Sequence, residues 1–185
     1  MRIIAGNYGG RRLRAVPGMK TRPTTDKIKE SMFNIIGPYF SGGVGLDLFA
    51  GSGGLSIEAV SRGLEHAYLV DRQYQAIKTI NENIEVTKEP ARFTVFKNDA
   101  ERILAKLHAD KITVDYLFLD PPYKQQKILS LLTKIIDLQL LNEDAVVICE
   151  TDQVAQLPDN ILNLELTRRA DYGITEVVVY RYRGE

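Results

Sequence analysis

Short apolar runs alternate with amphipathic stretches along most of the chain. Runs rich in Val, Ile, Leu and Phe predict buried β-strands at 44–49, 67–70, 93–96, 114–119 and 145–149. Between these runs, apolar residues recur with helical spacing at 55–62, 73–84, 100–108 and 125–138. Strands joined by crossover helices form a parallel sheet with helices on both faces. The pattern therefore predicts a doubly wound, Rossmann-like α/β fold.

The C-terminal end breaks this alternation. Residues 161–166 and 176–182 are consecutive strand candidates with no helical stretch between them. Consecutive strands joined by a short connection pair in the antiparallel sense. The mostly parallel sheet is therefore expected to end in antiparallel pairing.

The segment before the first buried strand also differs from the rest. Residues 2–5 and 13–16 can pair around the glycine-rich turns that separate them, which predicts a β-hairpin. Pro23-Thr24-Thr25 is typical of a helix start, and Gly37-Pro38 of a helix end. We expect a hairpin-and-helix extension over 1–43 and the α/β domain over 44–185.

The composition is typical of a soluble globular protein, and the length is that of a single domain. Of 185 residues, 44% are hydrophobic and 26% charged. The N-terminus lacks the apolar segment of a signal peptide, and no apolar run reaches the roughly 18 residues of a transmembrane helix. One cysteine and two histidines exclude an internal disulfide and argue against a zinc site. The expected location is the cytoplasm, and no metal is expected.

The charge is balanced overall but unevenly distributed. Residues 1–29 hold eight Lys and Arg residues against Asp26 alone, a net charge of +7, so the remainder carries −7. A basic arm on an acidic body favours a polyanionic partner near the N-terminus. A solvated basic surface without a partner is the alternative interpretation.

Residues 46–55 read Leu-Asp-Leu-Phe-Ala-Gly-Ser-Gly-Gly-Leu, a strand followed by a glycine turn and a helix start. A dinucleotide-binding G-x-G-x-x-G motif fails because position 56 is serine, and a P-loop fails because no Gly-Lys-Ser/Thr follows. The turn also resembles a hydrolase nucleophile elbow at Ser52, but His66 follows too closely and His108 lies in a charged helical stretch. A nucleoside with a cationic end and no phosphate fits this turn better.

Three carboxylates follow the first three strands. Asp71 can accept both hydroxyls of a ribose, Asp99 can accept from an adenine amino group, and Asp47 can face a methionyl ammonium. Each of them alone is equally typical of a helix N-cap. Their common position at the carboxyl ends of three strands favours a ligand site.

The most specific motif is Asp120-Pro121-Pro122-Tyr123, which directly follows a buried strand. An exocyclic base amine is a poor nucleophile because its lone pair is delocalised into the ring. The Asp120 carboxylate and the Pro121 carbonyl can accept its two hydrogens and stabilise the charge that develops during methyl transfer. Tyr123 can stack on a base. A strand stop with a capping aspartate is the alternative interpretation.

Together these motifs resemble the bacterial RsmD-type enzymes, which methylate N2 of a guanine in 16S ribosomal RNA. The resemblance spans essentially the whole chain. It includes Arg2-Ile3-Ile4-Ala5-Gly6, Gly10-Arg11-Arg12-Leu13, Thr21-Arg22-Pro23-Thr24-Thr25-Asp26, the glycine turn and Asp120-Pro121-Pro122-Tyr123. It implies S-adenosyl-L-methionine as cofactor and 16S ribosomal RNA as partner, either as free RNA or within a small ribosomal subunit.

The resemblance also implies a role for individual residues. Arg22 would pair with the cofactor's carboxylate, and the extension at 1–43 would bind RNA. The implied cofactor-binding residues are Arg22, Thr24, Thr25, Asp47, Phe49, Ala50, Gly51, Gly53, Asp71, Arg72, Asn98, Asp99 and Ala100. The implied catalytic residues are Asp120, Pro121 and Tyr123, and the implied RNA-binding residues are Arg11, Arg12, Arg14 and Tyr123.

Two other functions remain open at this point. Adenine N6 methylation of DNA uses the same Asp-Pro-Pro-Tyr chemistry, although the chain has no further domain with which to read a DNA sequence. A non-catalytic RNA-binding module would need neither Asp120 nor a cofactor pocket.

Overall fold

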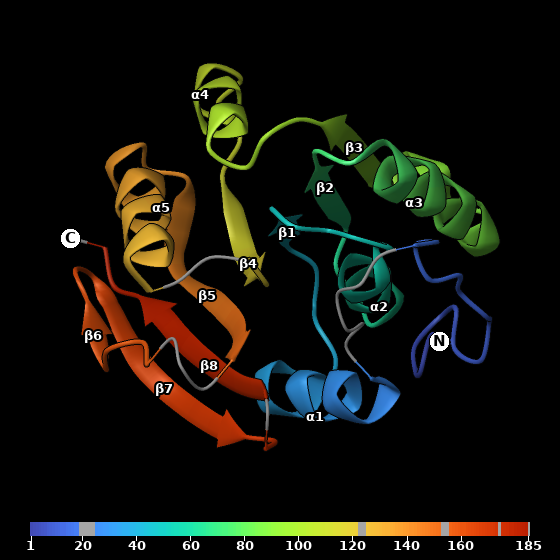
Figure 1. Cartoon of the computed structure of the whole chain (residues 1–185), viewed down its shortest axis with the longest axis horizontal. Coiled ribbons are helices and arrows are strands. Elements are labelled where there is room, and N and C mark those ends of the chain that lie inside the picture. The colour runs from blue at the N-terminus through green and yellow to red at the C-terminus, as the bar shows by residue number, and fades with distance from the viewer. Residues whose placement is uncertain (19–24, 122–124, 153–155, 174, 185) are drawn as a thin grey trace.

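The computed structural model describes residues 1–18, 25–121, 125–152, 156–173 and 175–184 (Figure 1). Within these ranges, a single eight-stranded sheet has the order β3-β2-β1-β4-β5-β8-β7-β6. The parallel half comprises β1 (Val44–Asp47), β2 (His66–Asp71), β3 (Phe93–Lys97), β4 (Val114–Leu119) and β5 (Leu141–Asp152). The antiparallel half comprises β6 (Asn160–Ile161), β7 (Leu164–Asp171) and β8 (Thr175–Tyr182). The predicted fold class is confirmed.

Helices cover both faces of the sheet, as Figure 1 shows. They are α1 (Asp26–Ile36), α2 (Gly54–Ser61), α3 (Tyr74–Thr87), α4 (Arg102–Ala109) and α5 (Gln125–Asp137), with a 3₁₀ turn at Pro90–Arg92. One core cluster joins α4 and α5 to the sheet through residues such as Leu104 and Ile135. A second joins α1, α2 and α3 to the other face through residues such as Phe33 and Ile57. The apolar stripes of the helices therefore account for the layered architecture. Within the described residues, no helix combines the length and apolar character needed to cross a membrane.

The strands differ from the predicted ranges where polar residues extend them. The apolar centre of β5 was predicted as 145–149, but the strand runs from Leu141 to Asp152 because it pairs with β4 on one side and with the long β8 on the other. The predicted strand at 161–166 is divided by a tight turn in which Leu162 has a φ of 49°. Cross-strand pairing, which single-residue propensity does not capture, determines these boundaries.

The N-terminal hairpin forms in a shorter register than predicted. A single antiparallel bridge joins Arg2 to Arg12, and the flanking bonds run from the Ile3 N–H to the Arg11 carbonyl (2.9 Å) and from the Leu13 N–H to the Met1 carbonyl (3.0 Å). The predicted strand at 13–16 does not form, because the Arg14 N–H instead donates to Asn83 Oδ1 of α3 (2.8 Å). The arm therefore lies across α2 and α3 rather than standing as a separate hairpin.

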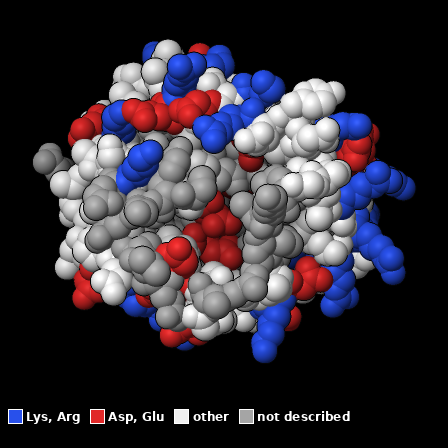
Figure 2. Space-filling model, in the orientation of Figure 1, with Lys and Arg blue, Asp and Glu red and all other residues white. Residues whose placement is uncertain are grey.

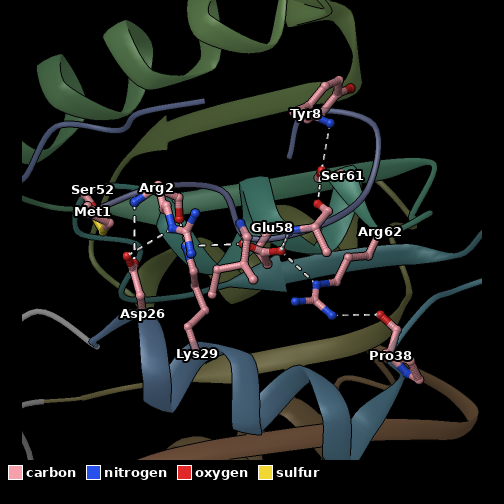
Figure 3. Close-up of polar contacts among 12 residues, drawn as sticks. Met1, Arg2, Tyr8, Asp26, Lys29, Pro38, Ser52, Glu58, Ser61 and Arg62 are labelled. Atoms are coloured by element: carbon pink, nitrogen blue, oxygen red, sulfur yellow. Dashed lines mark hydrogen bonds and ion pairs between the residues drawn. The ribbon is translucent and has the colours of Figure 1, made fainter. Parts of the chain in front are cut away.

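A buried carboxylate on α2, Glu58, holds this arm and α1 in place (Figure 3). Its side chain is fully buried and accepts from the Ile4 N–H (2.8 Å) and the Ala5 N–H (3.1 Å). Its oxygens also pair with Lys29 Nζ of α1 (3.3 Å) and with Arg62 Nε (2.7 Å), both nearly inaccessible to solvent. Burial lowers the pKa of Lys29, and the Glu58 charge opposes that shift. Four donors from three segments thus share one carboxylate.

Both cations make further contacts that extend this network. Lys29 Nζ donates to the Arg2 carbonyl (2.7 Å), and Arg62 Nη1 donates to the Pro38 carbonyl (3.2 Å). The Arg62 guanidinium also lies 5.0 Å from the centroid of the Phe33 ring. The buried charges are therefore both neutralised and hydrogen-bonded, which is the condition under which buried ions are tolerated.

We expect Glu58→Gln to destabilise the protein by about 3–5 kcal/mol, because it leaves two buried cations without a counter-charge. Urea unfolding monitored by circular dichroism measures the change. Glu82→Gln is the matched control, since Glu82 pairs with Arg14 at the surface (3.6 Å) and its loss should cost no more than about 1 kcal/mol. A Glu58→Gln variant as stable as this control would contradict the assigned role.

Candidate active site at the carboxyl ends of the central strands

The glycine turn after β1 is held open by contacts to the neighbouring elements. The Ala50 N–H donates to the Val70 carbonyl (2.9 Å), the Gly53 N–H to the Ala50 carbonyl (2.8 Å), and Asn83 Nδ2 to the Ser52 carbonyl (2.8 Å). Gly51 has a φ of 58°, and a side chain there would meet no atom within 4 Å. The backbone at Gly51 therefore faces open space, as a turn that receives a ligand requires.

Asp71 lies at the end of β2, beside this turn. Its Oδ2 accepts from the Gly51 N–H (2.9 Å) and its Oδ1 accepts from the Gln73 N–H (2.9 Å). The carboxylate thus shapes the glycine turn as well as facing the same edge of the sheet. Each oxygen has a second lone pair, so these bonds leave it able to accept from a ligand.

Asp99 and Asn98 follow β3, and their contacts are local. Asp99 Oδ1 accepts from the Glu101 N–H (2.9 Å) and the Arg102 N–H (3.2 Å) at the start of α4, while Asn98 Oδ1 accepts from the Asp99 N–H (2.8 Å). The capping interaction considered as an alternative is therefore present at Asp99. It occupies one carboxylate oxygen, so capping and ligand binding are compatible.

Asp47, the last residue of β1, is a carboxylate almost without solvent contact, at 2% exposure. Its Oδ1 accepts from the Phe49 N–H (3.1 Å). Burial raises the pKa of Asp47 to about 7, with smaller contributions from the negative charges of Asp71 and Glu150. Among the residues that the structure describes, no cation forms an ion pair with Asp47, which agrees with the raised pKa of this carboxyl.

Asp120 lies next to Asp47, because Asp47 pairs in register with Phe118 of β4 and Asp120 is two residues further on. Asp120 is accessible to solvent, and Pro121 after it is buried. Partial burial, together with the neighbouring negative charges of Glu150 and Asp47, raises the pKa of the Asp120 carboxyl to about 8. Figure 2 shows acidic side chains at the bottom of a hollow on this face of the molecule.

Glu150 of β5 is the acidic neighbour that the sequence analysis missed. It is 7% exposed and follows Cys149, which pairs with Leu119 of β4, so it lies beside Asp120. The strand predicted from the apolar run covers 145–149 and does not include Glu150. An acid that directly continues an apolar strand, as in Val146-Val147-Ile148-Cys149-Glu150, was the available signal.

Comparison with known proteins places this geometry in a family. A family model described as "Conserved hypothetical protein 95" matches residues 1–181. The chain belongs to this family. The chain is 50% identical over 184 residues to "Putative rRNA methyltransferase YlbH" of Bacillus subtilis (strain 168), covering 100% of both chains. It is 28% identical over 185 residues to "Ribosomal RNA small subunit methyltransferase D" of Escherichia coli (strain K12), covering 100% of this chain and 91% of the relative.

A solved structure gives the same result. "Putative methyltransferase yhhF from Escherichia coli" has a TM-score of 0.85 and 29% identity, covering 100% of this chain and 99% of that one. The resemblance to RsmD-type enzymes that the motifs indicated is confirmed, as is the methyltransferase fold.

The other implied site residues of this family member have different surroundings, and some lie outside the described residues. Phe49, Ala50 and Gly53 belong to the glycine turn, and Arg72 is exposed after Asp71. Ala100 is buried beside Asp99. Thr25 caps α1, where its Oγ1 accepts from the Ile28 N–H (3.2 Å). The predictions for Arg22, Thr24 and Tyr123 fall outside the described residues.

The three arm arginines differ in their surroundings. Arg11 Nη1 donates to the Val86 and Thr87 carbonyls at the end of α3 (3.0 and 3.1 Å), and its guanidinium lies 5.4 Å from the Tyr8 ring centroid. Arg14 is exposed and 3.6 Å from Glu82. Arg12 is exposed, and no ion pair to it occurs within the described residues. Arg12 and Arg14 are thus open to a polyanion, whereas Arg11 also anchors the arm to α3.

The burial of Asp47 predicts how the free energy of unfolding changes with pH. Because its pKa in the folded protein is about 7 instead of 3.8, the protonated form stabilises the fold at low pH, and this stability is lost as the pH rises through 7. Asn at this position keeps an oxygen for the Phe49 N–H but carries no charge. We therefore expect Asp47→Asn to be more stable than the wild type at pH 8 by about 2–4 kcal/mol, with the difference vanishing towards pH 4.

Thermal and urea unfolding between pH 4 and pH 8 check this expectation. Asp110→Asn is the control, because Asp110 pairs with Lys106 at the surface and its replacement should change stability by less than about 1 kcal/mol throughout. An Asp47→Asn variant that loses stability at pH 8 would show that the buried carboxylate has a positive partner.

Proposed function

We propose that the chain transfers a methyl group from S-adenosyl-L-methionine to the exocyclic N2 amine of a guanine in 16S ribosomal RNA. The observation that carries this proposal is the convergence of Asp47 and Asp120 beside the glycine turn, with Glu150 behind them. Negative charge concentrated in a hollow favours a cationic ligand and a reaction that develops positive charge.

The residues present fit this cofactor. The raised pKa of Asp47 marks a buried carboxyl that would gain from a cationic neighbour, and Gly51 leaves space for the methionyl part. Asp71 would accept from the ribose hydroxyls, and Asn98, Asp99, Arg72 and Ala100 would surround the adenine. Arg22, Thr24 and Thr25 would hold the methionine carboxylate, and Phe49, Ala50 and Gly53 complete the turn. The cofactor supplies an activated methyl group on a positively charged sulfur.

Asp120 and Pro121 act on the substrate amine. The carboxylate and the Pro121 carbonyl each accept one N–H, which turns the nitrogen lone pair towards the methyl group. The bound cofactor would give its methyl group to the amine nitrogen and leave as S-adenosylhomocysteine, and Asp120 or water would take the proton that the amine loses. The positive charge of the bound cofactor would lower the raised pKa of the Asp120 carboxyl, so that this group would be ionised and able to accept the proton. Tyr123 would stack on the target base.

The RNA substrate is inferred from the relatives and from the basic arm. Two relatives carry names that specify ribosomal RNA, and one of these specifies the small subunit. The arm presents Arg12 and Arg14 to solvent, and Arg11 next to them. Arginine side chains in this arrangement suit a phosphate backbone, which would position the guanine without reading its sequence.

Single-turnover transfer from radiolabelled cofactor tests the function through Asp120. The wild type should methylate unmodified 16S ribosomal RNA, free or in small subunits, and not DNA. Asp120→Ala should reduce the rate constant by about 10²-fold or more, because the charge it stabilises exists mainly in the transition state. Asp120→Asn keeps an acceptor oxygen and should fall between the two.

The affinity for S-adenosylhomocysteine is the control, and it should remain near that of the wild type in both variants because Asp120 faces the substrate. A near-normal rate in Asp120→Ala would contradict the proposed role of the motif. Methyl transfer to adenine in DNA, with none to RNA, would favour the alternative function.

A further inference from the structure

A groove separate from the acidic hollow lies between α1 and the β7–β8 hairpin, which adjoin in Figure 1. Its volume is 690 Å³, within the range of well-formed ligand sites. Val146 and Val179 form an apolar floor, while α1 contributes Ser31 and Asn34. The side chains of Ser31 and Asn34 make no hydrogen bond within the described part of the chain.

Two arginines, Arg168 and Arg181, line this groove. Arg168 of β7 is exposed and Arg181 of β8 is partly exposed. Within residues 1–18, 25–121, 125–152, 156–173 and 175–184, no carboxylate forms an ion pair with either of them. Glu165 lies across from Arg181 in the β7–β8 pairing, but its ion pair is with Arg183 (3.2 Å).

A β-bulge places Arg168 in the groove. Leu164 and Leu166 of β7 pack on the α4–α5 side of the sheet, so strict alternation would turn Arg168 to that side as well. The register shifts between Leu166 and Arg168, and Arg168 then pairs with Val179, whose side chain packs on the α1 side. The bulge thus brings a second guanidinium to the face that already holds Arg181, as bulges at functional edges commonly do.

The register of the sheet also places this groove within reach of the active site. Arg168 is level with Phe118 of β4 through Val179 and Ile148, two residues before Asp120 and three strands across. A rise of about 3.3 Å per residue and a spacing of about 4.8 Å between strands put the Cα atoms of Arg168 and Asp120 roughly 16 Å apart. Tyr172, at the turn of the hairpin, lines the same groove at the edge of the sheet that carries Asp120, and it packs against the core on the α1 side.

We propose that this groove binds the sugar–phosphate backbone of the RNA substrate a few nucleotides from the methylated base, with Arg168 and Arg181 as the phosphate ligands. The inference rests on the proposed function and adds a second contact surface to the N-terminal arm. Guanidinium groups bind phosphate oxygens through paired N–H donors, and the Ser31 and Asn34 side chains can add neutral hydrogen bonds. RNA held at the arm and at this groove would be fixed on both sides of the acidic hollow, which by itself repels a polyanion.

The test is the binding of an unmodified 16S ribosomal RNA transcript at several salt concentrations. The double variant Arg168→Ala/Arg181→Ala should bind about tenfold more weakly or worse, and its salt dependence should flatten by about 0.7–0.9 per lost phosphate contact. Arg183→Ala is the matched control. Arg183 directly follows β8, the strand that carries Arg181, but its side chain is already paired with Asp144 and Glu165. This variant should retain wild-type RNA affinity.

A double lysine variant tests whether the guanidinium groups themselves are needed. Arg168→Lys/Arg181→Lys should keep the salt dependence while losing part of the affinity, since lysine cannot form the paired contact. Thermal unfolding and S-adenosylhomocysteine affinity should be unchanged in all of them. Unchanged transcript affinity in the double alanine variant, beside a wild type that methylates the transcript, would overturn this inference and leave the proposed function intact.

Small ribosomal subunits distinguish RNA from a protein partner. Weaker binding of the double alanine variant to both transcript and subunits supports the inference. Normal binding to the transcript with weaker binding to subunits would assign the groove to an acidic ribosomal protein and overturn it. A wild type that transfers no methyl group to either RNA would instead remove the proposed function itself.

Discussion

Glu58 is the buried charge on which the arrangement of the first half of the molecule depends. One carboxylate on α2 accepts from the backbone of the N-terminal arm and pairs with Lys29 of α1 and with Arg62. Since α2 begins directly after the glycine turn, these contacts connect the arm and α1 to the ligand-facing edge of the sheet. Asn83 adds a second connection, because its amide binds both the Ser52 carbonyl of the turn and the Arg14 carbonyl of the arm. The N-terminal extension therefore packs directly against α2 and α3, which flank the glycine turn.

Asp47 and Asp120 differ from Glu58, because neither forms an ion pair with a cation within the described residues. Asp47 and Asp120 have raised pKa values, and Glu150 contributes to both. Such a site is destabilising for the free protein and becomes favourable when a cation binds, which is the usual relation between stability and function at an active site. The contrast with Glu58 is informative: an acid that serves the fold is surrounded by donors, whereas the acids proposed to serve the reaction are surrounded by one another.

Much of the fold was predictable from sequence because buried strands are encoded by apolar runs of the right length. The residues at the strand ends followed, since a parallel sheet brings all its carboxyl ends to one edge. What sequence could not supply were contacts between distant segments. Glu58 resembles a surface residue of a short helix until α2 is seen to be buried on nearly all sides. Arg11 lies in a basic segment that is typical of RNA-binding surfaces, yet its guanidinium donates to carbonyls of α3.

Register was the second kind of information missing from the sequence. The bulge in β7 reverses the side of the sheet to which Arg168 belongs, and no alternation pattern predicts it. The polar extension of β5 likewise hid Glu150, which completes the acidic hollow. Both depend on which residues face each other across strands, a property of the assembled sheet rather than of any one segment.

The central claim is that the acidic hollow methylates a guanine amine in ribosomal RNA. The most direct measurement is mass spectrometry of nucleosides from 16S ribosomal RNA, after incubation with the purified protein and S-adenosyl-L-methionine carrying a deuterated methyl group. Labelled N2-methylguanosine should appear at a single position, in free RNA or in small subunits. Labelled N6-methyladenosine, a label on a ring nitrogen or carbon, or no label in either RNA form would contradict it.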